Sequence, residues 1–229
     1  MDMYRTVFSE ITFKKHMLKT YTWMFLGVVI TFVSAFVIAN VPAIMLFAYS
    51  GIMPLLFIVA QFGVVIALSA RIMKMKETTA KILFIAYSVL TGITFSILGY
   101  AYAAVDIAAA FIAAVAFYGC LVVIGATTKA DLSKIGTIAF AGLFGLILYQ
   151  IFAVIFHFDA DVTLISIIGL IIFCGITTWD VQKAKELYFR NEGNDALLAN
   201  LSIYSAFELY LDFINIFLYI LRILGNAKD

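Results

Sequence analysis

The sequence predicts an all-α polytopic membrane protein with seven transmembrane helices, the C-terminal helix being central in the bundle. Of its 229 residues, 65% are hydrophobic and only 13% are charged, and the mean hydropathy is +1.08. A water-soluble domain of this size exposes far more charge. Because the bilayer itself buries the apolar surface, we expect a single transmembrane domain over residues 1–229.

The individual spans follow from their length. A transmembrane helix needs about 20 mainly apolar residues. Seven stretches meet or approach this length, at residues 21–39, 54–70, 82–103, 107–126, 135–156, 162–179 and 197–224. Residues 43–53 are apolar as well, which allows the second helix to start earlier and tilt. The seventh stretch is the most polar, so a segment that only dips into the membrane stays open beside a full span.

Basic residues in the loops predict the orientation. They gather near the N-terminus and in the loops after the second, fourth and sixth stretches: Arg5, Lys14, Lys15, Lys19, Arg71, Lys74, Lys76, Lys81, Lys129, Lys134, Lys183, Lys185 and Arg190. The other connections, residues 40–42, 104–106 and 157–161, contain no Lys or Arg. The positive-inside rule therefore predicts a cytoplasmic N-terminus, with residues 1–20 as a cytoplasmic tail.

A carboxylate lies deep in the last apolar stretch. Burying Asp212 in a bilayer costs roughly 2.5 to 3.5 kcal/mol on insertion scales. Glu208, Asp212 and Asn215 are spaced i, i+4 and i+7, which places them on one face of a helix, and Tyr204 extends this face by one turn. Lipid would reject such a face, so we expect it to look towards other helices or a water-filled cavity.

A second aspartate, Asp180, follows the sixth stretch. Its position alone fits a solvated loop residue as well as a site residue. Arg71, at the end of the second stretch, is equally understandable as a topology anchor; if the two ends meet, Arg71 and Asp180 can form a charge-assisted pair. Asp212 lies about 22 Å along its helix from Leu197. Contact between the two aspartates therefore requires the sixth helix to tilt or the seventh to begin later.

The sequence gives little support for a tightly bound cofactor. Cys120 and Cys174 are isolated in apolar runs, which gives no zinc or redox spacing. No acidic loop of the EF-hand kind is present. The net charge of +1 gives no electrostatic reason to expect nucleic acid. The lipid bilayer is the expected partner.

Three strings resemble the Bax inhibitor-1 (transmembrane Bax inhibitor motif) family. They are LYLDFINIFLYILR at residues 209–222, WDVQK at 179–183 and YSVLTGIT at 87–94. The seven-span layout fits as well, and the resemblance covers essentially the whole chain. The YLDFIN string is the most specific. The combination is most similar to the bacterial branch, which implies the bacterial inner (cytoplasmic) membrane.

The resemblance implies a pH-sensitive calcium leak. In that family the aspartates that match Asp180 and Asp212 share a proton near the cytoplasmic side, and an arginine, best matched by Arg71, latches onto the first. These aspartates would also attract the transported Ca²⁺ weakly, with Glu208 and Asn215 along the ion path.

The chain departs from the family at a second ion pair. The family places an acidic residue on the second helix opposite an arginine that matches Arg222. Here the corresponding position is Gln61, which is neutral. The departure puts this ion pair in doubt and weakens the expected attraction of calcium inside the pore.

Physical chemistry is consistent with a leak. Two carboxylates within hydrogen-bonding range cannot both ionise cheaply, so one holds a proton near neutral pH. Loss of that proton adds negative charge, which can attract Ca²⁺ and rearrange the latch. Conduction needs only weak oxygen ligands, because tight binding would stop the ion.

Three other functions stay open. An intramembrane aspartyl protease would need a Gly-x-Gly-Asp motif, which neither aspartate has, so we expect no enzyme. The resemblance also implies members that restrain membrane proteases or stress and cell-death proteins through exposed loops or the N-terminal tail. A proton-coupled transporter of another ion is the third alternative.

Overall fold

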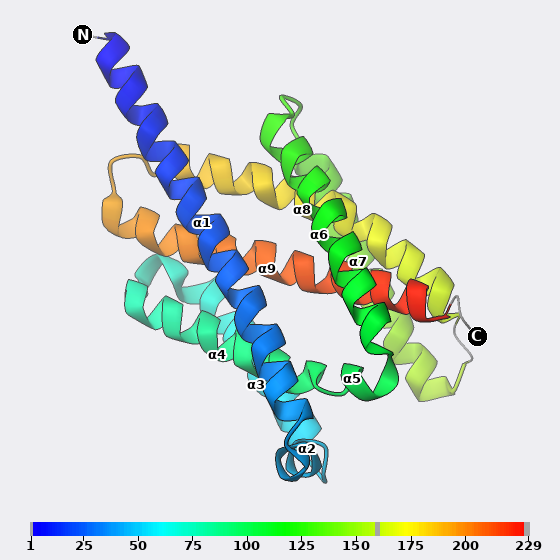
Figure 1. Ribbon diagram of the computed structural model, residues 1–229. Helices are drawn as coiled ribbons and strands as arrows, with labels where there is room; N and C mark the ends of the chain where they lie inside the picture. The colour runs from blue at the N-terminus through cyan, green and yellow to red at the C-terminus, as the bar shows by residue number, and fades with distance from the viewer. Residues whose placement is uncertain (1, 159–160, 227–229) are drawn as a thin grey trace. The chain divides into compact units, whose positions relative to one another are not determined.

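The computed structural model describes residues 2–158 and 161–226, with side chains from Thr12 to Phe158 and from Asp161 to Gly225. This part of the chain is helical and contains no strand (Figure 1). Its elements are α1 (Asp2–Ala39), α2 (Pro42–Ala48), α3 (Met53–Arg71), the short 3-10 helix η1 (Ile72–Lys74), α4 (Glu77–Phe95), α5 (Leu98–Ala101), α6 (Ala104–Thr127), α7 (Ser133–Phe156), α8 (Val162–Arg190) and α9 (Asp195–Asn226).

The helices confirm the predicted class. Within the described residues, six stretches are long and apolar enough to cross a membrane: Thr12–Ala39, Met53–Lys74, Glu77–Ala101, Ala104–Thr127, Ser133–Phe156 and Val162–Arg190. The seventh predicted helix is α9, which has 32 residues and is not among these six stretches. Among the described side chains, α9 carries more buried residues than any other helix. Its core residues include Leu201, Phe207, Leu209, Phe217 and Leu221.

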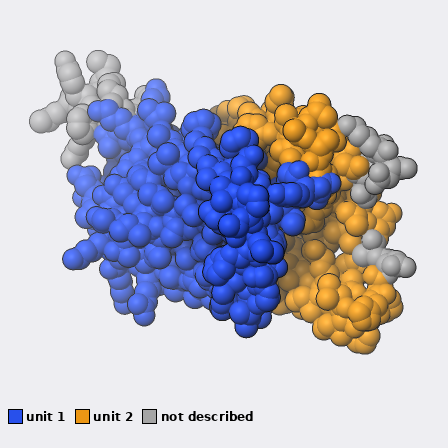
Figure 2. All heavy atoms as spheres, turned by 60° about the horizontal axis from the view of Figure 1, so that its bottom comes forward, with its two compact units in different colours: residues 1–101, 184–210 blue, residues 102–183, 211–229 orange. Residues whose placement is uncertain are grey.

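The chain forms two compact units, coloured separately in Figure 2. Unit 1 contains Met1–Ala101 and Ala184–Tyr210, and unit 2 contains Tyr102–Lys183 and Leu211–Asp229. Helices α8 and α9 contribute residues to both units. The expectation that the whole chain acts as one domain stays a prediction.

In unit 1, α1 packs along α4 at close range. Gly92 on α4 makes this possible, because a Cβ there would lie 2.5 Å from the Ser34 side chain and 2.7 Å from the Thr31 carbonyl oxygen. Small residues allow transmembrane helices to approach in this way. Phe84 then packs edge-on against the rings of Phe207 and Tyr210 from α9.

Glycines do the same in unit 2, around one part of α8. A Cβ on Gly125 of α6 would lie 2.5 Å from the Thr178 carbonyl oxygen. Gly136 of α7 lies against the indole ring of Trp179, which also packs edge-on against Phe140. The turn of α8 at residues 178–182 is therefore enclosed by α6 and α7.

Three helix boundaries differ from the predictions. Helix α1 already begins at Asp2 and therefore runs through residues 2–20 of the predicted tail into the first span. Residues 42–48 form the separate helix α2 instead of extending the next span, because the chain turns at Gly51 with φ of 52°. Finally, α8 continues through the predicted loop to Arg190, since no Gly or Pro interrupts it before Gly193.

Candidate functional site

Asp180 lies inside α8 and is only 4% exposed. The helix continues for ten residues beyond it to Arg190, a distance of about 15 Å. The interpretation of Asp180 as a solvated residue at the start of a loop is therefore wrong. Asp180 lies about 15 Å before the end of α8, and Asp212 was expected about 22 Å from the start of its own helix. The two aspartates therefore differ less in depth than the sequence indicated.

The turn that carries Asp180 is fixed to the loop between α6 and α7 by Gln182. The Gln182 side-chain oxygen accepts a hydrogen bond of 2.8 Å from the backbone N–H of Leu132. The amide nitrogen of the same side chain donates a 2.8 Å bond to the Ala130 carbonyl oxygen. A side-chain amide with both ends bound to backbone holds its helix and the loop in one arrangement.

The same loop also begins α7. The Asp131 carboxylate accepts a 2.9 Å hydrogen bond from the backbone N–H of Ser133, two residues further on, as in an Asx turn. Hydrogen bonds from the Ser133 side chain and backbone lower the pKa of Asp131. This carboxylate is fully exposed, so we expect it to stabilise only the start of α7.

Lys183 is the charged neighbour of Asp180 that the sequence analysis missed. Its ammonium lies 3.8 Å from the Asp180 carboxylate and 5.0 Å from the centre of the Trp179 ring. The signal was present in the sequence as an i, i+3 spacing, but that spacing brings two side chains together only in a helix. The hydropathy pattern ends this helix at residue 179, and it therefore predicts Lys183 as a loop residue and not as a neighbour of Asp180.

Asp212 lies on α9 and is 2% exposed. It therefore shares with Asp180 a place in unit 2 and nearly complete burial. Asn215, one turn further, is half-buried, and its amide donates a 2.8 Å bond to the Leu211 carbonyl oxygen of the same helix. The direct approach of the two aspartates stays a prediction.

The other predicted site residues are less buried. Arg71, at the end of α3, is exposed, and Glu208 is half-buried. Gln61 of α3, also half-buried, donates a long 3.5 Å bond to the Thr94 hydroxyl. Arg222 lies 5.8 Å over the Tyr219 ring. Arg71 and Gln61 belong to unit 1, whereas Asp180 and Arg222 belong to unit 2; both predicted pairings stay predictions.

The side chains available as ligands limit how a metal ion could be bound. Among the described residues, no three or more His, Cys, Asp and Glu side chains come together as a metal site. A calcium ion at Asp180 and Asp212 would have to complete its coordination with other oxygens, while stable calcium sites use six to eight.

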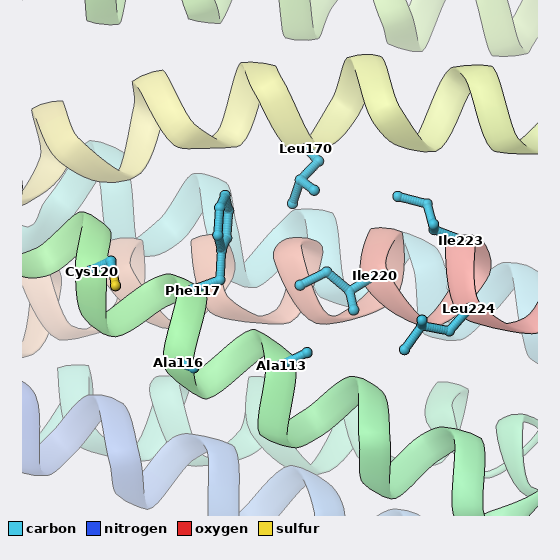
Figure 3. Close-up of a pocket in the computed structure, with 8 residues that line it drawn as sticks. All are labelled: Ala113, Ala116, Phe117, Cys120, Leu170, Ile220, Ile223 and Leu224. Carbon is cyan, nitrogen blue, oxygen red and sulfur yellow. The ribbon is translucent and has the colours of Figure 1, made fainter.

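Unit 2 also contains an apolar groove of about 460 Å³ between α6, α8 and α9. Figure 3 shows side chains from the three helices that point into it. It is lined by Ala113, Ala116, Phe117, Cys120, Leu170, Ile220, Ile223 and Leu224. No oxygen ligand lines this groove, so it offers nothing to a cation.

The apolar helices of the described residues are those of a multi-pass membrane protein. Residues 13–229 match the sequence profile of the family described as "Inhibitor of apoptosis-promoting Bax1". The chain belongs to this family, which confirms the predicted resemblance.

Three bacterial relatives match almost end to end. The "Inner membrane protein YbhL" of Escherichia coli (strain K12) is 37% identical over 215 residues, which cover 93% of this chain and 92% of that protein. The "Uncharacterized protein RP147" of Rickettsia prowazekii is 34% identical over 216 residues, 94% and 91% of the two chains. An uncharacterized protein of Borreliella burgdorferi is 35% identical over 224 residues, 96% of each. None of these three names denotes an enzyme.

Proposed function

We propose that the protein is a pH-sensitive calcium leak of the bacterial inner membrane, gated by Asp180 and Asp212. The observation that carries the proposal is the burial of both carboxylates, at 4% and 2% exposure, in one unit of a mainly apolar chain. Acidic residues within membrane spans are costly and usually mark an ion or proton path. The E. coli relative, an inner membrane protein by name, supports the location.

In the proposed mechanism the two aspartates share one proton, since two neighbouring carboxylates resist ionising together. Arg71 pairs with Asp180 in the closed state. Loss of the shared proton adds a negative charge to the aspartate pair, and this charge attracts Ca²⁺. The newly charged carboxylate then competes with its partner for Arg71. Lys183 lies within 3.8 Å of Asp180 in the structure. We expect it to limit the negative charge that an approaching ion meets.

The direct test is ion flux into liposomes that contain the purified protein, with Ca²⁺, Na⁺ and H⁺ compared at pH 6 and pH 8. A calcium flux that changes between the two pH values supports the proposal. A flux of protons or Na⁺ without Ca²⁺ would instead indicate the proton-coupled transporter. No flux of any ion would favour a membrane-embedded regulator, as the family description itself suggests.

Arg71→Ala separates the latch from the sensor. The substitution removes the proposed closed-state pair and leaves both aspartates in place. We expect higher calcium flux at the pH where the wild type is closed, with part of the pH response retained. Lys74→Ala, an exposed basic residue on the neighbouring η1 helix, is the matched control. An equal rise in both variants would show an effect of surface charge alone.

A further inference from the structure

Unit 1 carries a cluster of basic side chains where the membrane-crossing stretches of α1 and α4 begin. We call it the basic α1–α4 surface. It consists of the described lysines of this part of the chain and one glutamate: Lys14, Lys15, Lys19, Lys74, Lys76, Lys81 and Glu77. Lys19 and Lys81 lie beside Glu77. Lys14, Lys15, Lys74 and Lys76 are exposed, so most of this charge is accessible.

The centre of the surface has an unusual arrangement. The ammonium groups of Lys19 and Lys81 lie 3.0 Å and 2.8 Å from the same oxygen of Glu77. One carboxylate cannot neutralise two ammonium groups, so one positive charge remains at this point. All three side chains are about one-third exposed, which leaves room for a second anion to approach.

The ring of Trp23 lies beside Lys81, one of these lysines. The ammonium of Lys81 is 5.5 Å from the centre of the half-buried Trp23 ring. Tryptophan is enriched where spans meet the headgroup layer, because its indole combines an apolar body with a polar N–H. Lys19 and Trp23 lie at the start of the apolar run of α1, and Glu77 begins the stretch Glu77–Ala101, whose helix α4 packs against α1. From this position we expect the excess charge to lie at the height of the lipid headgroups.

We infer that the basic α1–α4 surface binds the phosphate headgroup of an anionic phospholipid, with Lys19 and Lys81 as its central contacts. Charge complementarity selects the anionic class, and the position at the ends of two spans selects a lipid instead of a soluble anion. Juxtamembrane lysine clusters bind anionic lipids through this attraction. The inference does not depend on ion conduction.

The test is a lipid titration of the purified full-length protein by native mass spectrometry in detergent, with phosphatidylglycerol and phosphatidylcholine compared. The wild type should prefer phosphatidylglycerol. Lys19→Gln with Lys81→Gln removes the two central charges. At about fivefold per lysine, we expect the preference to fall roughly 25-fold. Glu77→Gln removes the competing carboxylate, so it should keep or increase the preference.

The matched control is Lys129→Gln with Lys134→Gln, which removes two exposed lysines from the loop between α6 and α7. This pair should retain most of the preference. An equal loss in the control, or a wild type without preference, would overturn the inference. Full displacement of the lipid by free glycerol phosphate at the same concentration would also overturn it, because the site would then bind a soluble phosphate. Thermal melting of every variant checks that a loss does not reflect unfolding.

Discussion

The buried polar side chains of unit 1 are hydroxyls, His16 and the Asn200 amide, whereas unit 2 contains two buried carboxylates. In unit 1 the Thr31 hydroxyl lies 2.6 Å from the Tyr210 hydroxyl and donates to the Ser88 carbonyl oxygen at 3.0 Å. In unit 2, Asp180 and Asp212 are 4% and 2% exposed.

The difference separates structure from function. A neutral hydroxyl that finds its hydrogen-bond partners stabilises the fold without carrying charge. A buried carboxylate is far more expensive, and packing alone does not explain two of them. The comparison therefore places the candidate function in the carboxylates and assigns the hydroxyl network to folding.

The largest expected effect comes from Asp212→Asn. It retains the shape of the side chain but removes a charge from the proposed ion path. A unit charge near 4 Å contributes about 4 kcal/mol at an effective dielectric constant of 20, so even a third of this lowers calcium flux about tenfold. Liposome flux at pH 8 measures it. Undiminished flux would mean that Asp212 does not line the path.

The packing around Asp180 can be disturbed without touching a charge. Gly125→Ala places a Cβ 2.5 Å from the Thr178 carbonyl oxygen and 2.9 Å from Val181 Cβ. Because the backbone oxygen cannot move aside, we expect a destabilisation of about 1 to 3 kcal/mol, measured by thermal unfolding in detergent. Gly145→Ala on α7, with nothing within 4 Å, is the control and should change little. Equal melting temperatures would contradict the tight packing.

A substitution in the hydroxyl network of unit 1 should lower the stability of the protein without changing the pH dependence of calcium flux. Tyr210→Phe removes the hydroxyl that lies 2.6 Å from the Thr31 oxygen. The expected loss is about 0.5 to 1.5 kcal/mol of unfolding free energy, the usual net contribution of one hydrogen bond. The pH profile of flux should remain that of the wild type. A changed profile would show that the hydroxyl network takes part in gating, and the comparison between the units would fail.

The smallest effect concerns Asp131, at the start of α7. Hydrogen bonds from Ser133 lower the pKa of Asp131 in the folded protein. Its contribution to stability is therefore present above the ordinary aspartate pKa of 3.8 and is lost as the pH falls through the lowered value. Melting temperatures of Asp131→Ala and wild type should differ slightly at pH 7, and the difference should shrink as the pH falls below 3.8. A constant difference would exclude the carboxylate as the cause.

The sequence predicts the helices well, because hydropathy directly reports which segments avoid water. The end of α8 was harder to predict. Residues 181–190 contain several charges and resemble a loop by hydropathy, yet Glu186 and Arg190 form an i, i+4 ion pair at 3.1 Å. Weighing helix continuity against hydropathy would have extended α8 to Arg190.

The candidate site was predicted only in part. Asp180 and Asp212 were identified from their setting in apolar segments and are both buried. The position of Lys183 beside Asp180 depends on the continuation of α8. The two hydrogen bonds of Gln182 are made with a loop that is far away in the sequence. Such contacts arise from tertiary packing, which the local pattern of one sequence does not encode.

The pH profile of calcium flux in Asp180→Asn liposomes tests the central claim most directly. Glu186→Gln is the matched control, because it removes another carboxylate from α8 that is 44% exposed and paired with Arg190. Between about pH 6 and 8, where His and coupled carboxylates titrate, Asp180→Asn should show a flattened profile with raised flux where the wild type is closed. Glu186→Gln should keep the wild-type profile. A wild-type profile in Asp180→Asn would contradict the proposed gate.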